Sequence, residues 1–459
     1  MRSSVIVVFS IVAVWASGAL PLLAGETGRP LSGEPFAVYR DGSVKGRMID
    51  AGFVLGETNY HAVQQASDGF VYYGVGSHAP GASATLFRYD PRTGAVKALG
   101  AMNDIVGEDG SKVFNQGKIH CDLYEMNGIL FFSTQGGAYQ GGNYGPYPGG
   151  HFLSCTLSTG KFTDYGIGAP GEGMVTMAMD TVRGRMYAIT WPGMHFVSFD
   201  VPSGKVRDYG KSVATPGIAD LTAVPGNRSL AVDPRDGNVY WHNMDETISR
   251  YDRSRDTVEV LKSPRLDRLI LKTTRSGFDR VLWRSIRWSG TMQRFYGVDA
   301  VCEYLFSFEP KSGELEIIDR ITAGPNRRSG AVTGASLAFE LDSDGRTVYY
   351  ITSARALLPD AAVRRELRLV TYDIPLRRYI DHGPIVLDDG RYPNGCSGLD
   401  VGRDGNLYLV CSIPLVTLEG NREKRIIAAH FADIPPEKLR GTTYEVNLVA
   451  VKNPLAAVK

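Results

Sequence analysis

A pattern that returns at intervals of 52 to 60 residues constrains the fold of this chain of 459 residues more than any other feature. Each copy has a strand, a tight turn rich in Asp-Gly or Asn-Gly, an aromatic strand, a loop, and two strands around a phrase such as YDPRTGAVKALG. The turns recur from Gly69 to Gly405. Four short strands per unit, in about seven copies, are typical of a β-propeller. The sequence therefore predicts an all-β propeller with seven four-stranded blades, and leaves six or eight blades open.

The two ends of the chain carry candidate strands that could close such a ring. Residues 36–52 resemble the last two strands of a unit that lacks its first two, so they could complete the last blade and leave no sheet edge open. Residues 444–452, YEVNLVAVK, compete for the same outer position. Either choice predicts a single propeller domain over residues 33–459.

The N-terminus predicts export from the cell. Arg2 precedes a long uncharged apolar run with small residues at Ser17, Ala19 and Ala24, which is typical of a secretory signal peptide over residues 1–24. The run is long enough that an uncleaved N-terminal anchor is the alternative. We expect a secreted or periplasmic protein with no membrane contact beyond this segment. The 50 basic and 49 acidic residues nearly balance, so a nucleic-acid surface is not indicated.

Five scattered cysteines do not predict a disulfide framework. An odd number leaves at least one of them unpaired within the chain, and no CxxC motif is present. Cys396 and Cys411 flank the turn at residues 404–405, where the expected register places them diagonally rather than opposite one another. We expect the cysteines to be small buried side chains.

Most of the histidines map to one end of the predicted propeller, at the starts of inner strands or in the loops between the second and third strands. These are His61, His78, His120, His151, His195 and His242. Any one of them alone is best interpreted as an ordinary hydrogen-bonded residue at a strand end. Six of eight at one rim predict a polar cleft at the mouth of the central channel. Most known sites of this architecture lie at that end, which is an argument by analogy.

A cleft of His, Tyr and Arg with aromatic walls suits an acidic sugar chain. Aromatic faces stack on sugar rings, and arginine pairs with a carboxylate. The matching reaction is β-elimination from a uronate. It needs a cation against the carboxylate, a base for the proton on the adjacent carbon, and an acid for the departing glycosidic oxygen.

Several phrases, among them NYHAVQQASDGFVYYGVGSHAP, QGKIHCDLYE, YPGGHFLSCTLSTGKFTDYG and TWPGMHFVSFD, resemble secreted bacterial propellers related to the ulvan-lyase type of polysaccharide lyase. The resemblance implies that two rim histidines, a tyrosine and an arginine carry the elimination, beside a structural zinc. His120 matches the first histidine. Where the second is expected this chain has Gln135, so His151 in the same loop is the candidate replacement. Tyr147 and Arg287 are chosen by rim position alone.

The remaining rim residues are expected to bind the acidic polysaccharide or another glycan. They are His61, Tyr60, Lys118, Gln135, His195, Trp191, Glu172 and Arg284. Two alternatives stay open. One is a non-catalytic propeller that binds glycans or proteins, and the other is a metal-dependent hydrolase or lactonase with ligands among Glu57, Glu172, Asn394 and Asp299. No cofactor is predicted with certainty, and no spaced Cys/His cluster identifies a structural divalent metal, zinc or calcium. The glycine-rich loop 136–150 is either a lid or a plain insertion.

Overall fold

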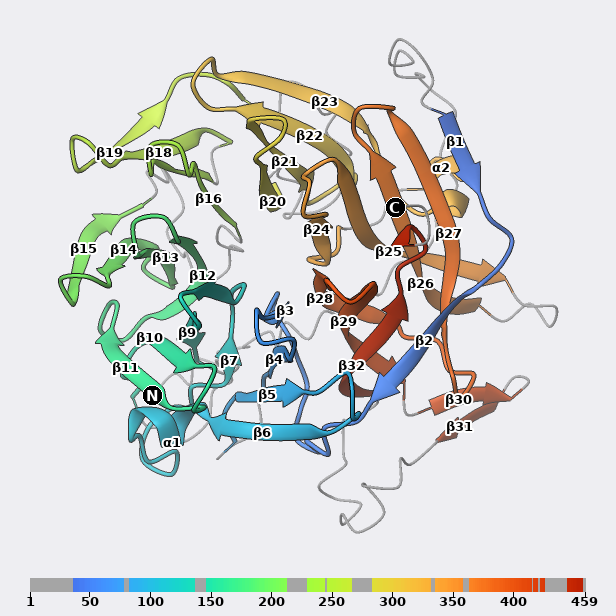
Figure 1. The fold of residues 1–459 in the computed structure, drawn as a ribbon, viewed down its shortest axis with the longest axis horizontal. Coiled ribbons are helices and arrows are strands. Elements are labelled where there is room, and N and C mark those ends of the chain that lie inside the picture. The colour runs from blue at the N-terminus through green and yellow to red at the C-terminus, as the bar shows by residue number, and fades with distance from the viewer. Residues whose placement is uncertain are drawn as a thin grey trace, which may run out of the picture.

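A computed structural model describes residues 36–77, 82–136, 146–212, 229–243, 246–265, 283–331, 335–357, 363–414, 416–419, 422–425 and 444–456. Within these residues, seven four-stranded blades are arranged as a ring around a common axis (Figure 1). The all-β propeller with seven blades is therefore confirmed. The predicted signal peptide, His78 and most of the 136–150 loop lie outside the described residues.

The first three blades follow one another along the chain. Blade one has the order β3 (Val63–Gln65), β4 (Val71–Val75), β5 (Thr85–Tyr89) and β6 (Val96–Ala101), followed by helix α1 (Met102–Val106). In blade two, β7 (Lys118–Ile119) and β8 (Tyr124–Met126) share the inner position beside β9 (Ile129–Gln135), β10 (His151–Thr156) and β11 (Phe162–Ile167). Blade three has β12 (Gly173–Asp180), β13 (Arg185–Trp191), β14 (His195–Asp200) and β15 (Lys205–Lys211).

The next three blades repeat the same order. Blade four has β16 (Leu230–Val232), β17 (Val239–His242), β18 (Ile248–Asp252) and β19 (Thr257–Leu261). Blade five has β20 (Trp283–Ser289), β21 (Arg294–Asp299), β22 (Tyr304–Glu309) and β23 (Glu314–Arg320), followed by helix α2 (Gly324–Ser329). Blade six has β24 (Phe339–Leu341), the long strands β25 (Thr347–Leu357) and β26 (Val363–Asp373), and β27 (Arg378–Leu387).

Blade seven joins the two ends of the chain. Its inner strands are β28 (Gly395–Val401) and β29 (Asn406–Pro414), its third strand is β32 (Tyr444–Lys452), and its outer strand is β2 (Val44–Ile49). Both predicted closing segments are therefore used, in adjacent positions. The strand β1 (Phe36–Tyr39) instead pairs in parallel with β27 of blade six, and β2 also extends that edge in parallel. A small hairpin of β30 (Val416–Glu419) and β31 (Arg422–Arg425) is inserted between β29 and β32.

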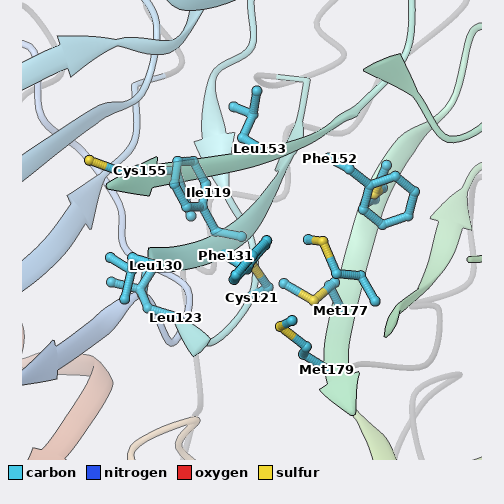
Figure 2. Packing of buried hydrophobic residues seen from close by; sticks show 14 of the residues in the cluster. Ile119, Cys121, Leu123, Leu130, Phe131, Phe152, Leu153, Cys155, Met177 and Met179 are labelled. Atoms are coloured by element: carbon cyan, nitrogen blue, oxygen red, sulfur yellow. The ribbon is translucent and has the colours of Figure 1, made fainter. Parts of the chain in front are cut away.

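Turn chemistry and apolar packing between the blades explain why this sequence folds in this way. Asn127 and Gly128 both have positive φ, 54° and 74°, as the tight hairpin between β8 and β9 requires. Side chains of blades one, two and three interlock in one buried cluster, including Ile119, Phe131 and Met177 (Figure 2). Burying each such side chain stabilises the fold by about 1.5–3 kcal/mol. Among the described residues, no helix has both the length and the apolar character needed to cross a membrane.

Candidate functional site

A bulge in the inner strand of blade two explains why polar residues stand in a strand position there. Ile119 pairs with Thr134, and the next pair is Tyr124 with Phe131, so four residues of the inner strand face two of β9. The Sγ atom of Cys121 accepts the Ser133 N–H at 3.3 Å in place of a main-chain partner. A bulge re-aims the side chains beside it. Here it turns residues 120–123 away from regular pairing with β9.

The bulge brings His120 against Tyr60 of blade one. The two residues form a parallel bridge, and their rings stack with centroids 4.1 Å apart at 19°. The Nζ atom of Lys118 lies 5.1 Å from the centroid of the Tyr60 ring, and Lys118 pairs with Gln135 across the sheet. We call Tyr60, Lys118, His120 and Gln135 the rim cluster. Four of the predicted site residues therefore lie together at one end of the propeller.

His151 and Tyr147 belong to a second network, which connects β10 to the segment between helix α1 and β7. The Tyr147 hydroxyl donates to Gln116 Oε1 at 2.9 Å, and Gln116 Nε2 donates to Glu108 at 3.0 Å. His151 lies between two carboxylates, with Nε2 3.1 Å from Glu108 and Nδ1 2.9 Å from Asp164. Both ring nitrogens are therefore engaged by the protein itself.

This arrangement keeps His151 positively charged. Burial alone would lower the pKa of His151, but the hydrogen bonds that His151 donates to Asp164 and Glu108 outweigh burial and raise the pKa to about 9. A histidine that is protonated at neutral pH and donates from both nitrogens cannot accept a proton from a substrate. The geometry supports His151 as a structural cation that ties helix α1 to blade two.

Replacing His151 with glutamine should remove a pH-dependent part of the stability. The folded-state pKa lies above the usual 6.5, so the stabilisation is fully present below pH 6.5 and is lost as the pH rises through 9. A shift of this size corresponds to about 3–4 kcal/mol. Urea unfolding of wild type and His151→Gln at pH 6 and pH 9.5 measures it. A stability difference that is equal at both pH values would contradict the assignment.

Arg287 lies at the propeller axis rather than on the open rim. Equivalent positions on the inner strands of blades five, six and seven carry Arg287, Glu340 and Asp400. Each of these residues is paired with a tyrosine on the second strand of its own blade. Arg287 Nε lies 2.8 Å from Glu340, and its NH2 nitrogen lies 2.6 Å from Asp122. Blades five and two are not neighbours in the ring, so the contact with Asp122 crosses the axis. We call Arg287, Asp122, Glu340 and Asp400 the axis cluster.

The axis cluster contains one arginine and three carboxyl groups. Burial tends to lower the pKa of Arg287, but the Asp122 and Glu340 charges outweigh burial and hold it above its usual value. Burial raises the pKa of Glu340, and it raises the pKa of Asp400 to about 7. Sequence reasoning placed Arg287 on the rim and missed its two anionic partners. The available signal was opposite charges at equivalent inner-strand positions of neighbouring blades.

The axis cluster also reaches the segment that leads into the first strand of blade one. His61 Nδ1 lies 3.8 Å from the Asp122 carboxylate, and the His61 side chain is buried. His61 has a φ of 67°, a conformation that few residues other than glycine adopt. His61 directly follows Tyr60 in the chain. Its position therefore couples the axis cluster to the rim cluster.

The other predicted binding residues lie on blades three and five. His195 Nδ1 lies 2.7 Å from Asp208, and Thr190 donates a hydrogen bond to Glu172. Trp191 lies at the end of β13 in the same blade. Blade three comes close to the rim cluster at Gly173, where a Cβ atom would stand 2.6 Å from Gln135 Cγ. Arg284 is half-buried in β20, and its carbonyl accepts the Ser229 hydroxyl.

The candidate metal ligands are not gathered into a site. Asp299 is fully buried and accepts N–H groups of Val301, Cys302 and Tyr304 at 2.6–2.7 Å, so its carboxylate caps a turn. Burial outweighs these hydrogen bonds and raises the pKa of Asp299 to about 6. Among the described residues, no group of three or more His, Cys, Asp or Glu side chains could hold a metal ion.

Comparisons with known proteins agree with the architecture. No protein-family model and no curated protein matches the chain. An oligogalacturonate lyase from Vibrio parahaemolyticus aligns over 93% of this chain and 97% of its own, with a TM-score of 0.50 and 11% identity. A protein described as a 6-phosphogluconolactonase from Bacteroides uniformis covers 74% of this chain and 90% of its own, with a TM-score of 0.45 and 14% identity.

A third similar structure is the extracellular domain of a one-component system from B. thetaiotaomicron. It aligns over 80% of this chain with a TM-score of 0.48 and 14% identity, and this chain spans only 39% of that protein. At such identities a likeness shows the fold and nothing finer. The chain is a β-propeller.

Proposed function

We propose that this protein is an exported lyase that cleaves an acidic, uronate-containing polysaccharide by β-elimination at the rim cluster. The observation that carries the proposal is the stack of Tyr60 on His120 with the Lys118 ammonium above the Tyr60 ring. This group contains two side chains that can transfer protons, as a base and as an acid, and one cation. These are the three components that the elimination needs. A solved oligogalacturonate lyase has a similar fold, so the proposed reaction is compatible with this architecture.

In the proposed reaction, His120 accepts the proton from the carbon next to the uronate carboxylate. The electron pair forms the new carbon–carbon double bond and expels the glycosidic oxygen, to which the Tyr60 hydroxyl donates a proton. Lys118 lies against the carboxylate and stabilises the negative charge that develops on it. His151, Tyr147 and Arg287, which the sequence placed in these roles, have side chains engaged by other groups of the protein. The proposal therefore moves their roles to Tyr60 and Lys118.

A product assay tests the proposal directly. The mature chain is incubated with a panel of uronate polysaccharides, including polygalacturonate, alginate and ulvan, and the ultraviolet absorbance of the unsaturated sugar is followed. A rise that Tyr60→Phe and His120→Gln both abolish supports the lyase. An absorbance that stays flat on every substrate, with folded protein, contradicts it.

The long hairpin of blade six offers a second contact for an acidic chain. Arg355 and Arg365 are directly opposite on β25 and β26, and both are exposed. Second strands run toward the end of the propeller where inner strands begin, so this pair lies at the same end as the rim cluster. Like charges directly opposite in a sheet repel one another. No ion pair of Arg365 is found among the described residues, and an anionic ligand between the two guanidinium groups would relieve the repulsion.

The double variant Arg355→Gln/Arg365→Gln should therefore weaken substrate binding without slowing the bond cleavage. We expect KM to rise by about tenfold while kcat changes little, because the pair contacts the chain away from the reacting sugar. Steady-state kinetics at two salt concentrations measure both constants. The matched control is Arg328→Gln, in helix α2, where the exposed Arg328 side chain packs over the Tyr39 ring. A fall in kcat with unchanged KM would contradict a binding role.

A non-catalytic glycan-binding propeller is the second candidate. The observation that favours it is the burial of the rim cluster, where the His120 side chain is 2% exposed and Gln135 is 5% exposed. Such a protein would bind a uronate polysaccharide saturably and release no product. Titration calorimetry on the same panel separates the two candidates.

A further inference from the structure

Two cysteines of blade seven are directly opposite one another. Cys396 on β28 pairs with Cys411 on β29, so the diagonal arrangement expected from the sequence is wrong. The register slips by one residue between Cys396 and Gly398, and this bulge moves Cys396 into the opposite position. Both side chains are buried, at 8% and 0% exposure. The Cys396 thiol donates a hydrogen bond to the Gly398 carbonyl at 3.3 Å.

The spacing of such a pair suits a disulfide bond. Directly opposite residues of antiparallel strands have Cα atoms about 4.5–5.5 Å apart, and a disulfide spans Cα separations of about 4.4–6.8 Å. The other three cysteines lie elsewhere. Cys121 and Cys155 belong to blade two, where Cys155 pairs with Leu130, and Cys302 belongs to blade five. Cys396 and Cys411 therefore form the one cross-strand cysteine pair among the described strands.

We propose that Cys396 and Cys411 form an intrachain disulfide when the protein folds in an oxidising compartment. A thiolate of the pair attacks a small-molecule or protein disulfide and displaces one thiol. The second cysteine then attacks the mixed disulfide and displaces the other thiol. The two cysteines together lose two protons and two electrons, and the donor disulfide is reduced to two thiols. The predicted signal peptide would deliver the chain to such a compartment.

The bond would connect the two inner strands of the blade that closes the ring. β29 is paired with β32, and β32 is paired with the N-terminal strand β2. A disulfide between β28 and β29 restricts the unfolded chain over this hairpin. It therefore stabilises the blade in which the N-terminal and C-terminal parts of the chain meet.

Burial determines when the bond can form and break. Burial, followed by the contact with Cys396, raises the pKa of the Cys411 thiol well above its usual value, so little thiolate exists in the folded protein. We expect the bond to form before blade seven is closed, and to resist reductant until the protein unfolds.

Peptide mapping of the wild-type chain tests the proposal without depending on any variant. The protein is refolded in a mixture of reduced and oxidised glutathione, denatured with an alkylating reagent, digested and weighed. We expect the Cys396 and Cys411 peptides to be linked and lighter by two hydrogen atoms than the same peptides after reduction, while Cys155 is alkylated. Full alkylation of Cys396 and Cys411 after oxidative refolding would overturn the proposal.

Thermal unfolding gives a second measurement. The oxidised wild type should unfold at a higher temperature than the fully reduced wild type, and the Cys411→Ser variant should show no such difference between the two conditions. The matched control, Cys155→Ser, should keep the difference. An equal midpoint for oxidised and reduced wild type would also count against the bond.

Discussion

Replacing His120 with glutamine should lower the rate of unsaturated-product formation by about 10²–10⁴-fold while the propeller stays folded. Glutamine keeps a polar side chain of similar length in the buried space against Tyr60, but it cannot accept a proton near neutral pH. The loss should appear in kcat and in kcat/KM together, because proton transfer occurs only in the transition state. Initial rates measured by ultraviolet absorbance on the responsive polysaccharide give both constants.

Tyr60→Phe is the companion variant, because phenylalanine preserves the ring that stacks on His120 and removes only the hydroxyl. We expect a loss of the same order, and no large further loss in the double variant, since residues that act as one unit are not additive. The matched control is Tyr209→Phe, which removes a hydroxyl from the outer strand β15 of blade three, where it bonds to Asp256. Turnover that survives both rim substitutions would show that the rim cluster does not carry the reaction.

The fold could be predicted because the information that sets it is local and repeated. Each hairpin depends on a turn whose residues tolerate positive φ, such as Asn127 and Gly128, and each aromatic strand buries its side chains against the next blade. The tail strand β32 and the N-terminal strand β2 both look like outer strands in isolation. Only their pairing, with β32 between β29 and β2, decides which of them lies outside.

The candidate site could be predicted only in part, because register decides it. The repeat shows that His120 and Tyr60 both lie near the starts of inner strands. Their stacking, however, depends on the bulge in which four residues of the inner strand lie opposite two residues of β9. In the same way, the pairing of Cys396 with Cys411 depends on the register slip beside Cys396. One inserted residue reverses the faces of the residues that follow it, but strands as short as β7 and β8 have too few residues for the alternation to show where the insertion lies.

Contacts across the axis were also beyond sequence reasoning. Arg287 and Asp122 are far apart in the chain and belong to blades that are not neighbours, so no local pattern connects them. From position alone, an arginine near the mouth of the channel is equally suited to a substrate carboxylate and to a carboxylate of the protein. Because Arg287 pairs with Asp122 and Glu340, substitutions of Arg287 and Glu340 can distinguish these two roles.

Replacing Arg287 with glutamine should lower the free energy of unfolding by about 3–5 kcal/mol, because it leaves the Asp122 and Glu340 carboxylates without their shared cation. The arginine is 18% exposed and the two acids are 24% and 23% exposed, so water screens little of the resulting repulsion. The loss should be smaller at low pH. Burial raises the pKa of Glu340, and it raises the pKa of Asp400 to about 7, so both groups favour the protonated form in the folded state. Their contribution to stability is lost as the pH rises, for Asp400 through about 7.

Urea unfolding of Arg287→Gln, Glu340→Gln and the double variant at pH 5 and pH 8 measures this coupling as a double-mutant cycle. If Arg287 is a structural cation of the axis cluster, neutralising Glu340 restores part of the lost stability, and the double variant is closer to wild type at pH 5 than at pH 8. If Arg287 instead serves the substrate carboxylate, its loss lowers the turnover rate at full stability, and the Glu340 change restores nothing. Because His61 joins Asp122 to the segment that carries Tyr60, the structural assignment also predicts that any loss of turnover in Arg287→Gln is partly recovered together with stability in the double variant.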